Sequence, residues 1–112
     1  FINEKNFNVN YTVIPYTGVS MIDFRFKVSK SIDRVDFIDS FEKSIFSGFL
    51  KNLYSINDKD LGPEVHNCST SSVVFIKENI KVNNNQIFLQ GYFDNENSAN
   101  RYFDLVNYIS LK

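Results

Sequence analysis

The chain has 112 residues, and its 12 Lys and Arg against 13 Asp and Glu leave a formal net charge of −1. The length predicts a single domain, or a fragment of one, over residues 1–112. The near-neutral charge excludes the strong basic field of nucleic-acid-binding proteins, so we expect no nucleic-acid partner. No apolar run approaches membrane-spanning length, so we expect no association with a membrane. The hydrophobic content of 43% is enough for a packed core.

The single cysteine and the first residue lead to two further expectations. One Cys cannot form an internal disulfide, which fits a reducing compartment, and no signal peptide is visible. We therefore expect a cytoplasmic protein. The chain begins with Phe1 and not with Met, and from this we expect a segment excised from a longer protein.

The first half of the chain predicts two strands and a helix. Apolar residues alternate with polar ones over 7–13 and, after an interruption at 15–18, over 19–30, which is the period of half-buried strands. Asp33 can cap a helix whose apolar residues follow at helical spacing, and Gly48 suits its exit. We expect this amphipathic helix to lie on a sheet.

The second half predicts further strands and a closing helix. Strands are expected over 49–56, 71–77, 80–82 and 86–93, with a long polar loop over 57–70 and a tight turn at 83–85. A final helix is expected from about Ser98 to Ser110. Its apolar stripe would consist of Ala99, Tyr102, Phe103, Val106 and Ile109.

The order of these elements predicts an α+β fold with a mainly antiparallel sheet and two helices packed on one face. A dinucleotide-binding domain would show a glycine-rich phosphate-binding fingerprint directly after a strand. No such fingerprint occurs in the sequence. We therefore expect no dinucleotide-binding domain within 1–112.

The most informative string lies at the end of the last predicted strand. Phe93-Asp94-Asn95-Glu96, followed by Asn100-Arg101 and Asp104-Leu105, resembles the C-terminal signature of the phosphorylating glyceraldehyde-3-phosphate dehydrogenases, which is Trp-Tyr-Asp-Asn-Glu and then Ser-Asn-Arg-Val-Val-Asp-Leu. The stretch 15–23 is similar to the family's Pro-Thr-x-Asn-Val-Ser-Val-Val-Asp, and 64–72 is similar to its loop Ser-Asp-Phe-Asn-Ser-Asp-x-His-Ser-Ser. The similarity keeps the same order over roughly residues 11–110.

The resemblance implies the later part of the catalytic domain of an NAD-dependent dehydrogenase of glycolysis. In that family the nucleophilic Cys and the general-base His lie upstream, so we expect no catalytic residue in this chain and no activity of the chain alone. Asn95 matches the asparagine that hydrogen-bonds the nicotinamide carboxamide, a task suited to an amide because it both donates and accepts. The alternative for Asn95 is a turn or helix-cap residue. Glu96 and Arg101 match positions expected to be structural.

The resemblance also implies the cofactor and the partners. NAD is expected to bind the complete parent protein but not this chain alone. The expected partners are the upstream dinucleotide-binding and catalytic segments, together with further copies in a homo-oligomer.

Departures from the family pattern keep a second interpretation open. Val13 stands where the family has a phosphate-binding Arg, and 97–99 replaces an aromatic residue, Gly and Tyr that are expected near the cofactor. The alternative is a degenerate dehydrogenase-like domain that acts as a structural or protein-interaction module. Cys68 and His66 are expected to be an exposed pair and not a catalytic dyad or a metal site, for which the ligands are too few.

Overall fold

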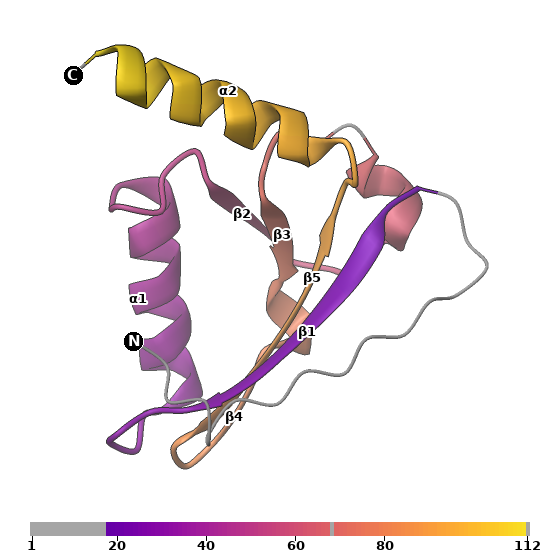
Figure 1. The fold of residues 1–112 in the computed structure, drawn as a ribbon. Coiled ribbons are helices and arrows are strands. Elements are labelled where there is room, and N and C mark those ends of the chain that lie inside the picture. Colours follow the sequence, from indigo (N-terminus) through magenta and orange to yellow (C-terminus); the bar gives the residue numbers. More distant parts are fainter. Residues whose placement is uncertain (1–17, 68, 112) are drawn as a thin grey trace, which may run out of the picture.

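The computed structural model describes residues 18–67 and 69–111. Its elements, in chain order, are β1 (Ser20–Lys27), α1 (Arg34–Phe46), β2 (Tyr54–Asn57), the 3-10 helix η2 (Pro63–His66), β3 (Val73–Ile76), the 3-10 helix η3 (Lys77–Asn79), β4 (Lys81–Asn83), β5 (Gln86–Phe93) and α2 (Asn97–Ser110). One five-stranded sheet with two α-helices confirms the predicted α+β class (Figure 1). The strand predicted over 7–13 lies outside the described residues.

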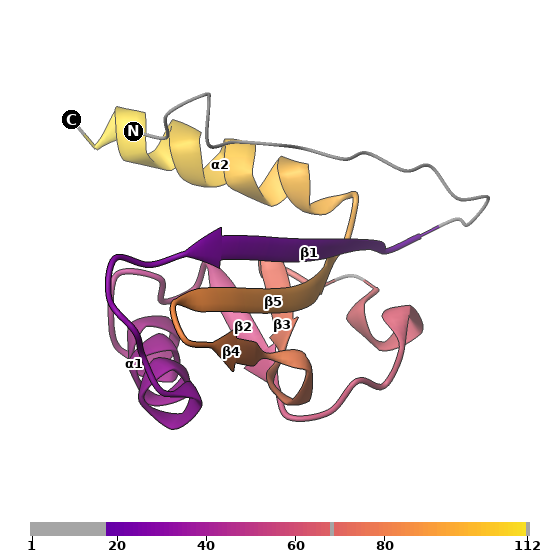
Figure 2. The ribbon, with the colours of Figure 1, turned by 90° about the horizontal axis from the view of Figure 1, so that it is seen from below.

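β5 is the central strand of the sheet. It pairs antiparallel with β1 along its whole length, from Ser20 opposite Phe93 to Lys27 opposite Gln86. On its other side it pairs antiparallel with β4 near its start and with β3 near its end. Within the described chain the strand order is β1-β5-β3-β2, which leaves β1 and β2 at the two edges (Figure 2).

The pair formed by β2 and β3 is parallel, so the sheet is mixed and the expected mainly antiparallel arrangement is corrected at this pair. The prediction included the long polar loop over 57–70 but did not infer a parallel pair from it. The long segment 58–72 brings the chain back to the end of the sheet at which β2 begins, and a parallel pair needs a connection of about a dozen residues or more. β2 also begins later than predicted, at Tyr54, because the residues before it form turns.

α1 closes the core on one face of the sheet. The carboxylate of Asp33 accepts a hydrogen bond from the N–H of Val35 at 2.9 Å, which confirms the predicted cap. The ring of Phe41 meets that of Phe75 nearly edge-on, with 5.1 Å between the centroids. The buried core on this face consists of Ile38, Val73, Phe75, Ile80, Ile87 and Leu89.

The opposite face is covered in part by the described residues of the segment 58–72, which are 58–67 and 69–72. Val19, Ile76 and Tyr92 form a second buried cluster. η2 lies within the segment and places the ring of His66 on that of Tyr92. The sheet is therefore covered by a helix on one face and by a mostly irregular connection on the other.

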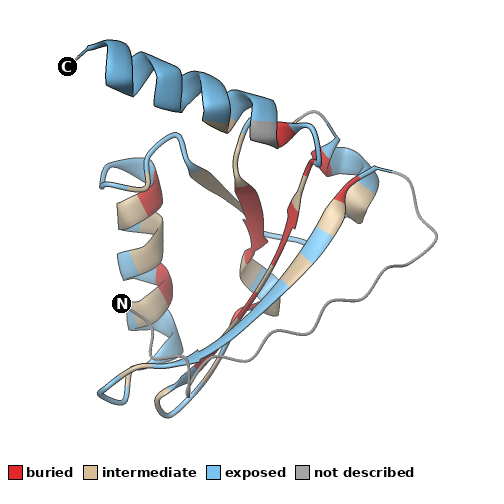
Figure 3. Ribbon diagram, viewed as in Figure 1, coloured by how far each residue is buried: buried red, intermediate tan, exposed pale blue. Residues whose placement is uncertain are grey.

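After its first turns, α2 buries little of its surface against the rest of the described chain. Asn97 at its start is buried, but every residue of 102–111 is exposed, including Phe103 at 67% (Figure 3). The predicted packing of both helices on one face is therefore wrong for α2, and its predicted stripe of Ala99, Tyr102, Phe103, Val106 and Ile109 is exposed. The helical spacing of apolar residues shows that a face needs a partner, but not that the same chain supplies it.

Candidate functional site

The Asp-Asn-Glu turn connects β5 to α2 and is closed by its own hydrogen bonds. Asp94 is buried, and its carboxylate accepts from the N–H of Glu96 at 3.0 Å. The N–H of Asn97 donates to the carbonyl of Asp94, also at 3.0 Å. These bonds fix the backbone on both sides of Asn95, whose side chain is exposed.

Asn95 ties this turn to the start of β1. Its Nδ2 donates to the carbonyl of Gly18 at 2.6 Å, and its Oδ1 accepts from the hydroxyl of Ser20 at 2.8 Å. These two bonds give Asn95 a structural role in the turn, which is one form of the alternative interpretation of this residue. Asn95 is not the helix cap, because the N-cap residue of α2 is Glu96. The cofactor role of Asn95 stays a prediction.

The amide of Asn95 has hydrogen-bonding capacity beyond these two contacts. A carboxamide has two N–H hydrogens and two lone pairs on its oxygen. The bond to Gly18 uses one N–H hydrogen of Asn95, and the bond from Ser20 uses one lone pair of its oxygen. These two bonds leave the second hydrogen and the second lone pair of the amide unused. One donor and one acceptor side by side are complementary to another carboxamide.

Two residues of α2 anchor the turn to the end of the segment 58–72. Nδ2 of Asn97 donates to the carbonyl of Ser71, and Nη2 of Arg101 donates to the carbonyl of Thr70 at 3.1 Å. Arg101 also forms an ion pair with Asp104 at 3.1 Å, and its structural role stays a prediction. Sequence reasoning missed the anchoring role of Asn97, because no local pattern distinguishes it from the chain's many other asparagines.

Polar atoms at this junction are buried without hydrogen-bond partners in the described chain. They are Oδ1 of Asn97 and the Nε and Nη1 atoms of Arg101. A buried unpaired donor or acceptor costs about 1–3 kcal/mol. The start of α2 therefore concentrates unmet hydrogen-bonding capacity within a few residues of Asn95.

His66 lies on the face of the sheet opposite α1 and is 3% exposed. The expected exposed pair is therefore wrong for His66, and Cys68 lies outside the described residues. The imidazole stacks on the ring of Tyr92, with 5.0 Å between centroids and 15° between planes. Burial lowers the pKa of His66, while the charge of Asp60 acts in the opposite direction. A stack between a loop and a distant strand leaves no local sequence pattern.

The hydroxyl of Tyr92 completes this cluster by donating to the carboxylate of Asp60, at 3.1 Å to Oδ1. Burial raises the pKa of Tyr92, and the hydrogen bond and charge of Asp60 raise it further. Among the described residues, no group of three or more His, Cys, Asp and Glu side chains is placed to hold a metal ion. The observed contacts of His66 are those of a packing residue.

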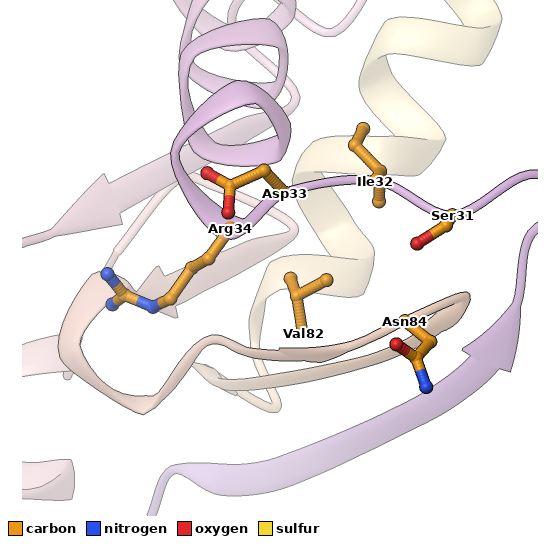
Figure 4. A pocket seen from close by; sticks show the side chains of 6 residues that line it. All are labelled: Ser31, Ile32, Asp33, Arg34, Val82 and Asn84. Carbon is orange, nitrogen blue, oxygen red and sulfur yellow. The ribbon is translucent and has the colours of Figure 1, made fainter.

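A hollow of about 350 Å³ lies at the start of α1 (Figure 4), and Asn95 is not among the residues that line it. Two of its polar side chains are already engaged: Asp33 caps α1, and Nε of Arg34 donates to the carbonyl of Ile80 at 2.9 Å. The guanidinium of Arg34 points away from Val82 and Asn84. We therefore interpret this hollow as a packing junction between α1 and the β4–β5 turn.

Two general findings complete the description. In the part of the chain that the structure describes, no helix has the length and apolar character that crossing a membrane requires. No model of a known protein family matches the chain, and no curated protein matches it significantly.

Proposed function

We propose that this chain is the C-terminal catalytic-domain segment of an NAD-dependent, phosphorylating glyceraldehyde-3-phosphate dehydrogenase of glycolysis. The complete protein would oxidise a phosphorylated aldehyde through a thiohemiacetal, transfer hydride to NAD and release an acyl phosphate. Upstream segments would supply the nucleophilic Cys, the general-base His and the dinucleotide-binding domain. The chain alone would be inactive and would not bind NAD.

The placement of Asn95 is the observation that carries this proposal. It stands within the Asp-Asn-Glu string, at an exposed turn between a strand and a helix. The carboxamide of nicotinamide presents one donor group and one acceptor group, and the amide of Asn95 can satisfy both beyond its bonds to Gly18 and Ser20. In this proposal the bonds to β1 orient the amide, and its remaining hydrogen and lone pair bind the cofactor.

The surroundings of Asn95 support a larger assembly. Apolar side chains are exposed along 102–111, and polar atoms of Asn97 and Arg101 are buried without partners in the described chain. Upstream segments of the parent protein, or further copies in a homo-oligomer, would cover the apolar side chains and supply hydrogen-bond partners for the polar atoms. We place such an oligomer in the cytoplasm, as the single cysteine led us to expect.

The second candidate is a degenerate domain that serves as a structural or protein-interaction module. The two intramolecular bonds of Asn95 favour it, because they give this residue a use that needs no ligand. Val13, in place of the family's phosphate-binding Arg, favours it as well. In that case the exposed surface of α2 would bind another protein.

The proposal is tested in the complete parent protein, or in an active family member whose C-terminal segment is replaced by this chain. Asn95→Ala removes both the proposed carboxamide contacts and the two bonds to Gly18 and Ser20. We expect NAD affinity to fall by the value of a buried hydrogen bond, about 0.5–1.5 kcal/mol, or more if the carboxamide is left unpaired. NAD affinity and the melting temperature are measured on the same samples.

Ser20→Ala is the matched control, since it removes one structural bond of Asn95 and leaves the amide in place. We expect it to lower the melting temperature slightly and to change NAD affinity less than Asn95→Ala does. If both variants lower the melting temperature and neither changes NAD affinity, Asn95 is a structural turn residue and the proposed enzyme role of this segment fails. An upstream sequence without a Cys-Thr-Thr-Asn segment would favour the module in the same way.

A further inference from the structure

The segment 58–72 contacts the rest of the chain near its start, in its middle and at its end, and backbone bonds from Glu78 N–H to the Asp58 carbonyl and from Ser72 N–H to the Leu53 carbonyl hold its two ends. Near its start, the carboxylate of Asp60 accepts from the hydroxyl of Tyr92 on β5 and from Nδ2 of Asn79, each at 3.1 Å. At its end, the last carbonyls before β3 accept from side chains of α2. Between these places, the ring of His66 stacks on that of Tyr92. The stack is thus the central contact of the segment.

His66 fits this stack as a neutral ring. Its Nε2 is buried and has no hydrogen-bond partner in the described chain. The carboxylates near the stack are Asp60, which already accepts from the Tyr92 hydroxyl, and Glu64 on η2. Neutral imidazole can leave one nitrogen unpaired at modest cost, but protonated imidazole carries a hydrogen on both nitrogens.

We propose that His66 is a pH-sensitive latch, whose neutral ring holds the segment 58–72 against β5 and whose protonation in mild acid releases it. The protonated ring would place a charged donor at Nε2, where no described residue offers an acceptor, and burying an unpaired charge is strongly unfavourable. In the open segment, water solvates the same charge. Protonation therefore favours the open form.

The direction of the pH dependence follows from the burial of the ring. Burial holds the pKa of His66 in the closed segment below its ordinary value of 6.5. The closed form is therefore fully favoured above about pH 6.5 and loses stability as the pH falls from there toward the lower closed-state pKa. Across this window, the ratio of open to closed molecules rises as the pH falls, by at most about tenfold for each pH unit.

Release of the segment would also affect the turn that contains Asn95. The carbonyls of Thr70 and Ser71, which belong to the same segment, hold the first turns of α2. Opening would therefore loosen the backbone that follows Asn95. The latch itself depends only on contacts among described residues and stands whether or not the proposed function is correct.

The first test uses the unaltered chain. His66 is its single histidine, so the imidazole proton signals in a proton NMR titration belong to this residue without further assignment. We expect a midpoint below 6.5 in the folded chain and a midpoint near 6.5 in urea. A folded-state midpoint at or above the urea value would overturn the latch.

The second test is amide hydrogen exchange between pH 7.5 and 5, with rates corrected for the intrinsic effect of pH. We expect opening of residues 61–67 and 69–72 to rise as the pH falls through the window, by at most about tenfold per pH unit, while the opening of amides that join β5 to β1 changes much less. His66→Phe keeps an aromatic ring on Tyr92 but cannot titrate, so its opening should not change with pH. Equal pH dependence in both proteins, or simultaneous opening of the whole sheet, would contradict the proposal.

Discussion

The two α-helices of this chain are similar in length and in apolar content, yet they have different surroundings. α1 has 13 residues and buries Ile38 and Ile45, whereas α2 has 14 residues and is exposed from 102 to its end. α1 begins with a side-chain cap from Asp33, and α2 has no side-chain cap. Length and apolar content therefore do not decide which helix becomes part of the core.

The partner available to each helix explains the difference. α1 lies over β3 and β5, whose side chains on that face are apolar and include Phe75 and Ile87. α2 is held at its start by polar bonds from Asn97 and Arg101, and its remaining turns expose large apolar side chains. Most apolar residues of α2 lie along one side of the helix, and such an apolar side indicates burial against a partner. α2 is thus suited to a partner beyond the described chain.

The sharpest contrast between the two regions is expected from truncating one phenylalanine in each. Phe75 is 4% exposed and contacts Phe24, Phe41 and Tyr54, so Phe75→Ala should lower the free energy of unfolding by about 3–5 kcal/mol. Phe103→Ala should change it by less than about 0.5 kcal/mol. Urea denaturation of both variants measures this. Similar losses for the two would show that α2 packs on the chain in solution.

The second largest effect on stability is expected from a substitution in β5, the central strand of the sheet. A Cβ atom at Gly91 would lie 2.6 Å from Cγ1 of Val73 and 2.7 Å from the carbonyl oxygen of Val74. Gly91→Ala should therefore force β3 and β5 apart and cost about 1–3 kcal/mol of stability. Thermal unfolding followed by circular dichroism tests this. An unchanged melting temperature would mean that the two strands are less closely packed than described.

The helix starts offer a third comparison, with an effect of about 1 kcal/mol. Asp33→Ala removes the carboxylate that accepts from Val35 N–H at the start of α1, and caps of this kind contribute about 0.5–2 kcal/mol. Glu96→Ala, at the same position of α2, removes no side-chain cap and should cost almost nothing. Denaturation curves of the two variants settle the comparison, and equal losses would refute it.

Much of the α1 region could be predicted from sequence because its signals are local. The cap at Asp33, the helical spacing after it and the left-handed residue Asn84 in the β4–β5 turn each follow from neighbouring residues. The bounds of β5, Gln86–Phe93, agree with the predicted strand 86–93. These features depend on side-chain period and turn chemistry, which a single sequence records directly.

The other region could not be predicted because its contacts join distant parts of the chain. The parallel pairing of β2 and β3 depends on where the segment 58–72 returns, and the burial of His66 depends on Tyr92. At the candidate site, Asn95 was predicted from a resemblance, but its bonds to Gly18 and Ser20 were not. The spacing of apolar residues on α2 likewise indicates that one face of the helix is to be buried, but it does not indicate which segment or protein buries that face.

The smallest effect on stability is expected at the far end of α2, where the effect on assembly should be clear. Val106 and Ile109 are each 62% exposed. Both are apolar side chains in contact with solvent on a helix that has no packing partner for them in the described chain. We expect the chain to self-associate through this surface at micromolar concentration. Val106→Lys with Ile109→Lys should reduce the sedimenting mass toward that of a monomer.

The same double variant should leave the free energy of unfolding within about 0.5 kcal/mol of the original, because neither side chain is buried and lysine suits the last turns of a helix. Asn100→Lys with Asn107→Lys adds the same charge on the more polar side of α2 and is the matched control. If the control lowers the sedimenting mass equally, charge repulsion and not the apolar surface explains the result. If the Val106 and Ile109 variant instead unfolds much more easily, α2 is packed on its own sheet in solution, and the contrast between the two helices disappears.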